Sequence, residues 1–169
     1  MVADAALTSS SDFNSQTAAS FSHLDTPKID RRNYGGWSAK TSRLGEWIRV
    51  DLGEAKVIES VTTQGRADAN QFVREYTLEY SEDGANYVTV ANSDGSGEML
   101  FSGNQDRTSL VTHVFPDVII ARYVKLVPTR HERWISLRWD LSGCDLGENS
   151  MKIDSLKLLK KSTCVKLNV

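Results

Sequence analysis

Apolar and polar residues alternate in short segments along most of this chain, and that alternation limits the fold more than any other feature. In residues 46–52, for example, every second side chain is apolar. Such a period of two places the apolar side chains on one face of a half-buried β-strand. Seven further segments read as short strands in the same way: 56–64, 73–81, 85–91, 98–103, 109–115, 121–128 and 134–143.

Turn residues separate these segments. Residues 81–84 (Ser-Glu-Asp-Gly) and 93–97 (Ser-Asp-Gly-Ser-Gly) have the composition that favours tight turns. We find no helical period of useful length before residue 147 and no internal repeat. About eight short strands with turns between them predict an all-β, antiparallel sandwich or barrel.

The composition is that of a globular domain. A length of 169 residues suits one domain with its own core, and 40% hydrophobic with 25% charged residues argues against disorder. A net charge of −2 gives no general attraction to nucleic acid, so we expect no such partner. No apolar run has the length of a membrane span, and the N-terminus lacks the basic start and apolar stretch of a signal peptide.

The chain changes character near Gly147. Residues 150–169 are rich in lysine and contain no aromatic residue. This change predicts a domain over residues 1–146, followed in 147–169 by a linker, the edge of another domain or a non-native extension. A short basic amphipathic helix that binds a surface is the alternative for this tail.

Signatures of catalysis are missing from the sequence. It contains no GxSxG, HExxH, GxGxxG or Walker motif. The three histidines, His23, His113 and His131, are scattered, and none lies beside a nucleophile signature. With two cysteines and so few histidines, a zinc site is not expected. We therefore expect a protein that is not an enzyme and has no cofactor.

Six blocks of the sequence together resemble a known family. They are WIRVDLG (47–53), VTTQGR (61–66), YTLEYSEDGANY (76–87), FSGNQDRTSLVTHVFP (101–116), IARYVKLVP (120–128) and ISLRWDLSGCDL (135–146). Their order and spacing are similar to those of a discoidin domain, also called the coagulation factor V/VIII C-type domain. The resemblance implies an eight-stranded, antiparallel, jelly-roll-like β-sandwich or barrel with its ligand loops at one end.

The family usually joins a cysteine near the start of the domain to one at its end by a disulfide. Cys144 occupies the closing position, but residues 2–5 contain no cysteine. Two alternatives follow from the resemblance: Cys144 pairs with Cys164, or it is a free, partly buried thiol.

The resemblance also implies that three loops project from one end of the domain: 21–36, 64–72 and 128–134. Members that bind phosphatidylserine membranes carry exposed Trp or Leu residues at the tips of these loops. In this chain the first loop offers only Leu24 and Ile29, and the second only Phe72. This composition argues against insertion into a bilayer.

The loops are instead polar and cationic. Arginine presents a planar fork of donors that suits carboxylate, sulfate or paired sugar hydroxyls, and an aromatic ring suits the apolar face of a sugar. The loop 64–72 is also similar to that of the discoidin lectins, which favours a galactose-type glycan. The candidate ligand residues are Arg66, Asp68 and Asn70, with Arg130, His131 and Arg133 opposite and Tyr34, Phe72 or Trp134 as the stacking ring.

Structural roles are the alternative for several of these side chains. Arg66 and Asp68 would then form a salt bridge across their loop, and Trp134 would belong to the core. We expect Trp47 and Trp139 in the core as well. Arg138 is expected to pair with a carboxylate inside the barrel.

Together these features predict a non-enzymatic adhesion or recognition module that is extracellular, secreted or displayed on the cell surface. The expected partner is a cell-surface or matrix glycan or glycoprotein. The alternatives are an extracellular protein or matrix component and an anionic phospholipid membrane surface. A single weak site usually needs repetition, so we expect tandem domains or a homo-oligomer.

Overall fold

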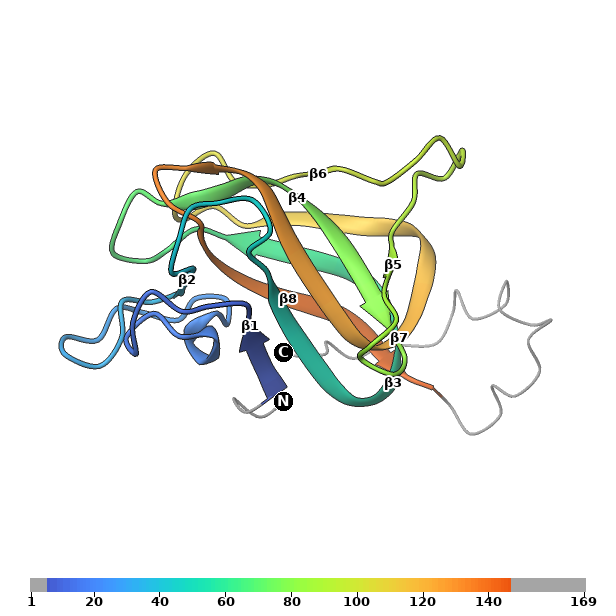
Figure 1. Ribbon diagram of the computed structural model, residues 1–169, viewed down its shortest axis with the longest axis horizontal. Coiled ribbons are helices and arrows are strands. Elements are labelled where there is room, and N and C mark those ends of the chain that lie inside the picture. Colours follow the sequence, from blue (N-terminus) through green and yellow to red (C-terminus); the bar gives the residue numbers. More distant parts are fainter. Residues whose placement is uncertain (1–5, 147–169) are drawn as a thin grey trace.

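The computed structural model describes residues 6–146, and within this range eight strands and one short 3-10 helix, η2 (Ala19–Phe21), make up the regular structure (Figure 1). Every strand pairing is antiparallel, so the all-β, antiparallel fold predicted from the sequence is confirmed. The strands are β1 (Leu7–Ser9), β2 (Trp37–Ser38), β3 (Ile48–Gln64), β4 (Phe72–Ser81), β5 (Val88–Thr89), β6 (Phe101–Ser102), β7 (Val111–Glu132) and β8 (Ser136–Asp145).

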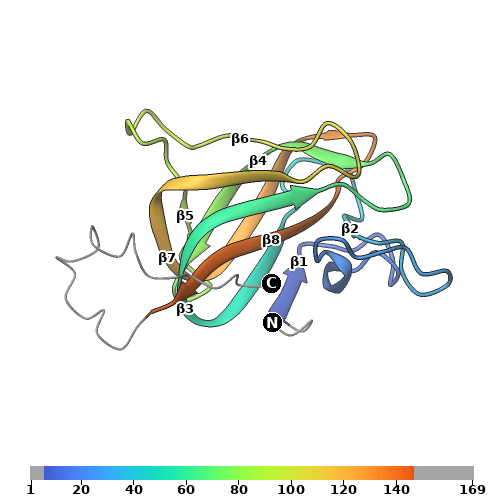
Figure 2. The same ribbon diagram turned by 180° about the vertical axis from the view of Figure 1, so that it is seen from behind.

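Two long strands, β3 and β7, bend and take part in both halves of the barrel (Figures 1 and 2). The first part of β3 pairs with β1 and with the second part of β7, which in turn pairs with β4. After a register shift between Asp51 and Lys56, the rest of β3 pairs with β8 and with the first part of β7. The resulting strand order is β2-β8-β3-β7-β4-β5, with β1 on β3 and β6 on β4.

Side-chain alternation decides which residues fill the barrel. In β8, Leu137, Trp139 and Leu141 are buried in the core, so the residues between them point to the opposite face of the sheet. Trp139 therefore lies in the core, as predicted from the sequence. Core side chains of this size each stabilise the fold by about 1.5–3 kcal/mol through burial.

Trp47 differs from its predicted core position. It is only partly buried and precedes β3 at the point where Ile48 enters the core. The guanidinium of Arg49 and the ammonium of Lys125 lie 5.7 and 5.6 Å from its ring centroid. Because Ile48 faces inward, Trp47 faces outward with the cations, and its ring packs on the outer surface of the sheet.

The strands expected over residues 85–91 and 98–103 are also shorter than predicted. Asp83 accepts hydrogen bonds from the backbone amides of Ala85 and Asn86. These bonds fix a turn at the position where the strand 85–91 was expected to begin. Only β5 and β6, two residues each, pair with β4 in this part of the chain. Local hydrogen bonds of this kind compete with sheet formation.

Several predictions concern residues outside the described range. Residues 147–169 include the lysine-rich tail and Cys164, so the domain boundary at residue 146 and the pairing of Cys144 stay predictions. Within residues 6–146, no helix has the length and apolar character needed to cross a membrane.

Gly143 in β8 marks a place where two backbones approach closely. A Cβ atom at this position would lie 1.9 Å from the carbonyl oxygen of Val57 and 2.9 Å from the Cα of Ile58. We therefore expect Gly143→Ala to lower the free energy of unfolding by about 1–3 kcal/mol, the usual cost of overpacking. Urea denaturation measures this loss. Ser142→Ala, at the neighbouring half-buried position, is the control, and an equal change in both variants would contradict the steric explanation.

Candidate functional site

The loops at one end of the barrel are tied together by a pair of side chains from β3 and β8. Gln64 and Arg138 are register partners at the end of these strands, and both side chains point away from the core. The Gln64 amide donates to Oδ1 of Asp25 and to the carbonyl oxygen of Thr108, at 3.0 and 2.8 Å. Its Oε1 accepts from the amide of Asp25 at 3.0 Å. One buried amide thus joins the loops that contain residues 25 and 108.

Arg138 joins the same loops and one more. Its Nε donates to the carbonyl oxygen of Gly65 at 2.7 Å, Nη1 to that of Thr26 at 3.2 Å and Nη2 to that of Arg107 at 3.0 Å. The side chain is buried, and burial lowers the pKa of the guanidinium. We call Gln64 and Arg138 the loop clamp.

The predicted partner of Arg138, a carboxylate inside the barrel, is therefore wrong. Arg138 lies between the core residues Leu137 and Trp139, so alternation turns it to the outer face of the sheet. The loops cover it there, and backbone carbonyl oxygens take the place of the expected carboxylate.

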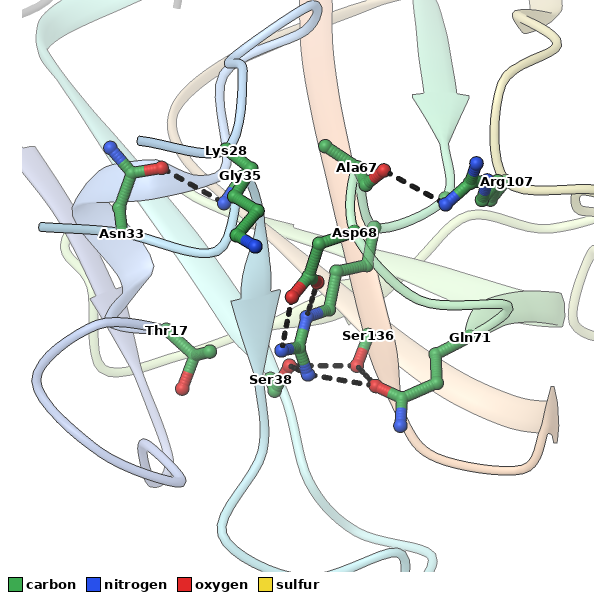
Figure 3. A network of polar contacts seen from close by, with 12 residues as sticks. Thr17, Lys28, Asn33, Gly35, Ser38, Ala67, Asp68, Gln71, Arg107 and Ser136 are labelled. Carbon is green, nitrogen blue, oxygen red and sulfur yellow. Dashed lines mark hydrogen bonds and ion pairs between the residues drawn. The ribbon is translucent and has the colours of Figure 1, made fainter. Parts of the chain in front are cut away.

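Beside the loop clamp, five polar side chains form a connected layer that we call the polar floor (Figure 3). Arg66 binds Asp68, with 2.6 Å between Nε and Oδ1 and 3.3 Å between Nη2 and Oδ2. Arg66 Nη1 also donates to Oε1 of Gln71 at 2.9 Å and to Oγ of Ser38 at 3.4 Å. Ser136 contacts Ser38 through their hydroxyls at 2.7 Å and donates to Gln71 at 3.1 Å.

The salt bridge expected between Arg66 and Asp68 as the structural alternative is thus formed. Their side chains are only 12% and 17% exposed, so the pair is largely shielded from water. Charge-assisted bonds of this geometry hold side chains in one orientation. The polar floor is therefore held in place by contacts within the domain.

The loop that carries Tyr34 closes one side of the polar floor. The Arg66 guanidinium lies 5.0 Å from the centroid of the Tyr34 ring. The amide of Ala67 donates to the carbonyl oxygen of Gly35 at 2.8 Å. Gly35 has a φ of +68°, and a Cβ there would lie 2.5 Å from that of Ala67. Only glycine allows the two loops to come this close.

Arg107 and its loop close the other side. The Arg107 guanidinium donates to the carbonyl oxygen of Ala67 at 3.2 Å. Asp106 shapes this loop by accepting hydrogen bonds from Ser109 and Thr108, and these bonds hold the pKa of its carboxyl well below the usual range. The Asp106 side chain thus fixes the turn that follows Arg107.

Phe72 does not lie where the prediction placed it. It begins β4 and is 2% exposed, so its ring faces no ligand. Asn70, in contrast, is exposed in the loop before it. The loop is shorter than predicted, because Phe72 already pairs with Glu132 in the sheet.

The three residues predicted opposite Arg66 lie at the end of β7 and in the turn that follows. Arg130 is exposed and lies 3.3 Å from a carboxylate oxygen of Glu75. His131 is partly buried opposite Val73, and Arg133 is exposed with a φ of +58°. Among the contacts of the described residues, none joins these three side chains to the polar floor.

Trp134 lies between its two predicted roles. It is partly buried, and its Nε1 donates to the carbonyl oxygen of Ala39 at 2.8 Å. The ring of Phe13 meets it edge to face, with 5.7 Å between the centroids. Phe13 is 54% exposed and Leu44 is 73% exposed. We call Phe13, Leu44 and Trp134 the apolar rim.

The sequence prediction missed Phe13 and Leu44, because both lie outside the three loops considered. Each stands alone among polar residues, and this isolation is the one sequence signal that could have identified them. Within residues 6–146, no group of three His, Cys, Asp or Glu side chains is placed to hold a metal ion.

The loop clamp yields a testable expectation. Lysine carries one ammonium group and cannot reach three carbonyl oxygens as the guanidinium of Arg138 does. We expect Arg138→Lys to lower the free energy of unfolding by about 2–4 kcal/mol, since bonds to charged groups contribute about 1.5–3 kcal/mol each. Hydrogen exchange at the amide of Ala67 should also become faster. Urea denaturation and exchange mass spectrometry measure both effects.

Arg74→Lys is the matched control for this variant. Arg74 is bound to Glu132 at the surface, where an ion pair contributes about 0–1 kcal/mol. If both variants lost the same stability, or if exchange at Ala67 did not change in Arg138→Lys, the clamp would not hold the loops.

Known proteins are similar to this chain in sequence and in fold. The profile of the F5/8 type C domain family matches residues 6–141. Human neuropilin-1 is 31% identical over 83% of this chain, and pig coagulation factor VIII is 33% identical over 75% of it. These matches span 15% and 6% of the two relatives, so the chain corresponds to a small part of each.

Solved structures agree with this assignment. Discoidin II from Dictyostelium discoideum superposes with a TM-score of 0.72 at 30% identity, over 80% of this chain and 52% of that one. A Clostridium perfringens module solved in complex with GalNAc-β-1,3-galactose has a TM-score of 0.57 at 24% identity, and it covers 80% of this chain and 92% of that one. This second likeness concerns the fold alone. The chain belongs to the F5/8 type C, or discoidin, domain family.

Proposed function

We propose that this domain is a non-enzymatic recognition module that binds a glycan or glycoconjugate of galactose type at its loop end. The observation that carries the proposal is the polar floor beside Tyr34, in which Arg66 fixes Asp68 and Gln71 next to an aromatic ring. Sugar sites combine such hydrogen-bonding groups with an aromatic surface.

Each group of the polar floor has a separate part in this proposal. Most donors of Arg66 are used by Asp68, Gln71 and Ser38, so Arg66 orients its neighbours rather than contacting the sugar. Oε1 of Gln71 already accepts two hydrogen bonds, which leaves its amide group to donate. Oδ2 of Asp68 accepts from a sugar hydroxyl, because Oδ1 is buried, and the exposed Asn70 adds a donor and an acceptor.

Rigidity supports the proposal as well. A side chain that is already held in place loses little entropy when a ligand binds. Because a single shallow site gives weak binding, we propose that the domain acts in tandem or in an oligomer, outside the cell or on its surface.

A glycan array with Arg66→Lys tests the proposal. Lysine cannot bind Asp68 and Gln71 at the same time in the geometry of the guanidinium, so affinity should fall about tenfold. Arg122→Lys is the matched control, because Arg122 forms an equivalent pair with Asp51 in the β3–β7 pairing, away from the loops. Galactose-type binding lost only in Arg66→Lys supports the site. An array without any binding, or equal loss in both variants, would contradict it.

An anionic membrane surface is the second candidate, and the apolar rim favours it. Leu44 and Phe13 are exposed at the loop end, and Lys40 and Arg43 lie in the same loop as Leu44. Exposed apolar side chains next to cations suit the boundary between lipid headgroups and acyl chains. The sequence prediction had argued against insertion, because it did not consider these residues.

Leu44→Ser tests this candidate with phosphatidylserine vesicles. Burial of a leucine side chain stabilises binding by about 1.5–3 kcal/mol, so the variant should bind at least about tenfold more weakly. Val114→Ser is the control, since Val114 is 74% exposed on β7. Vesicle binding that is absent in the parent protein, or unchanged in Leu44→Ser, would exclude insertion by the apolar rim. Absence of both glycan and vesicle binding would point to a protein or matrix partner.

A further inference from the structure

Charge is distributed very unevenly over this domain. We define the loop-end segments as residues 10–46, 64–75, 102–112 and 128–138. They contain eleven Lys and Arg residues against eight Asp and Glu residues, whereas the remaining described residues contain four against eleven. Although the net charge of the whole chain is only −2, the loop end is cationic and the remaining described residues are anionic. Such a separation steers anionic ligands toward one end of a protein.

Two of these cations are free to bind. Arg31 and Arg32 are exposed, and neither forms an ion pair with another described residue. They lie in a turn that is closed by a bridge between Ile29 and Asn33, and the amide of Arg32 donates to the carbonyl oxygen of Ile29 at 3.0 Å. The turn holds both guanidinium groups outside the body of the protein.

The turn lies next to the polar floor. It leads into Tyr34, which contacts Arg66, and into Gly35, which contacts Ala67. On the other side of this loop, Arg107 is exposed and contacts the carbonyl oxygen of Ala67. Figure 3 shows Lys28 and Arg107 on opposite sides of Ala67 and Asp68. Cations therefore flank the polar floor from two different loops.

The carboxylates around these cations have other partners, and Asp30, which precedes Arg31, is paired with Lys28. Asp68 is paired with Arg66 and is only 17% exposed. Asp106 accepts its hydrogen bonds from Thr108 and Ser109 within its own turn. None of these carboxylates forms an ion pair with Arg31, Arg32 or Arg107 among the described residues. Arg107 uses Nη1 for the carbonyl oxygen of Ala67, and its other donors and those of Arg31 and Arg32 serve a ligand.

We propose that the ligand of this site is an acidic glycan, that is, an oligosaccharide with sulfate or carboxylate groups. The inference rests on the proposed glycan function and names the class of sugar. Arg31, Arg32 and Arg107 bind the acidic groups, since a guanidinium matches sulfate and carboxylate with two parallel hydrogen bonds. The polar floor binds the hydroxyls of the same sugar chain.

The test compares three probes by surface plasmon resonance. They are a heparin-derived hexasaccharide, the same hexasaccharide after complete desulfation, and phosphatidylserine vesicles. We expect the sulfated probe to bind at least about tenfold more tightly than the desulfated one, with an affinity that falls as salt rises. Arg31→Gln/Arg32→Gln should weaken binding of the sulfated probe about tenfold, because two charged donors are lost.

A second double variant separates the local patch from net charge. Glu82 and Asp117 are exposed and lie outside the loop-end segments. Glu82→Gln/Asp117→Gln combined with Arg31→Gln/Arg32→Gln restores the net charge of the parent. Binding that stays weak in this combination supports the patch, whereas recovery of binding would overturn it.

The remaining outcomes distinguish this inference from the proposed function. Equal, salt-independent binding of the sulfated and desulfated probes would overturn the acidic-glycan inference and leave glycan binding intact. Vesicle binding without binding of either sugar would overturn both in favour of the membrane. No binding of any probe, together with an empty glycan array, would also overturn both.

Discussion

The loop end of this domain depends on one buried cation. Arg138 donates to carbonyl oxygens of three separate loops, and Gln64 beside it holds two of the same loops. Local structure orders parts of these loops, namely η2 before residue 25 and the turn at Asp106. A buried guanidinium without partners would be strongly unfavourable, so the cation and the three loops stabilise one another. This arrangement positions the loops that carry the polar floor, Tyr34 and the flanking arginines.

The barrel supplies the rigid base for that cation. Because β3 and β7 each belong to both halves of the barrel, each is held by pairings with more than one neighbouring strand. Gln64 ends β3 in register with Arg138, and Phe72 begins β4 opposite Glu132. The loop between Gln64 and Phe72 therefore starts and stops on well-anchored strands. Binding residues on loops are most precise when the underlying elements are rigid in this way.

Periodicity in the sequence was sufficient to predict the fold, because a period of two follows directly from strand geometry. The ion pair of Arg66 and Asp68 was expected only as the structural alternative to ligand binding, because the two residues are close in sequence. The expected partner of Arg138 and the expected core position of Trp47 were wrong, because their surroundings are made by loops and strands distant in the chain. Phe72 was misplaced because the end of a loop depends on strand register rather than on composition. The sequence did not identify Leu44 and Phe13, because their exposure depends on how their loops fold.

Arg138 contacts backbone atoms rather than side chains in every loop that it reaches. Its acceptors are the carbonyl oxygens of Thr26, Gly65 and Arg107, which any amino acid supplies. Mutations that replace side chains in these loops therefore change the surface of the loop end without removing an acceptor of Arg138. The anchoring of the three loops to β8 thus does not depend on which side chains the loops themselves carry.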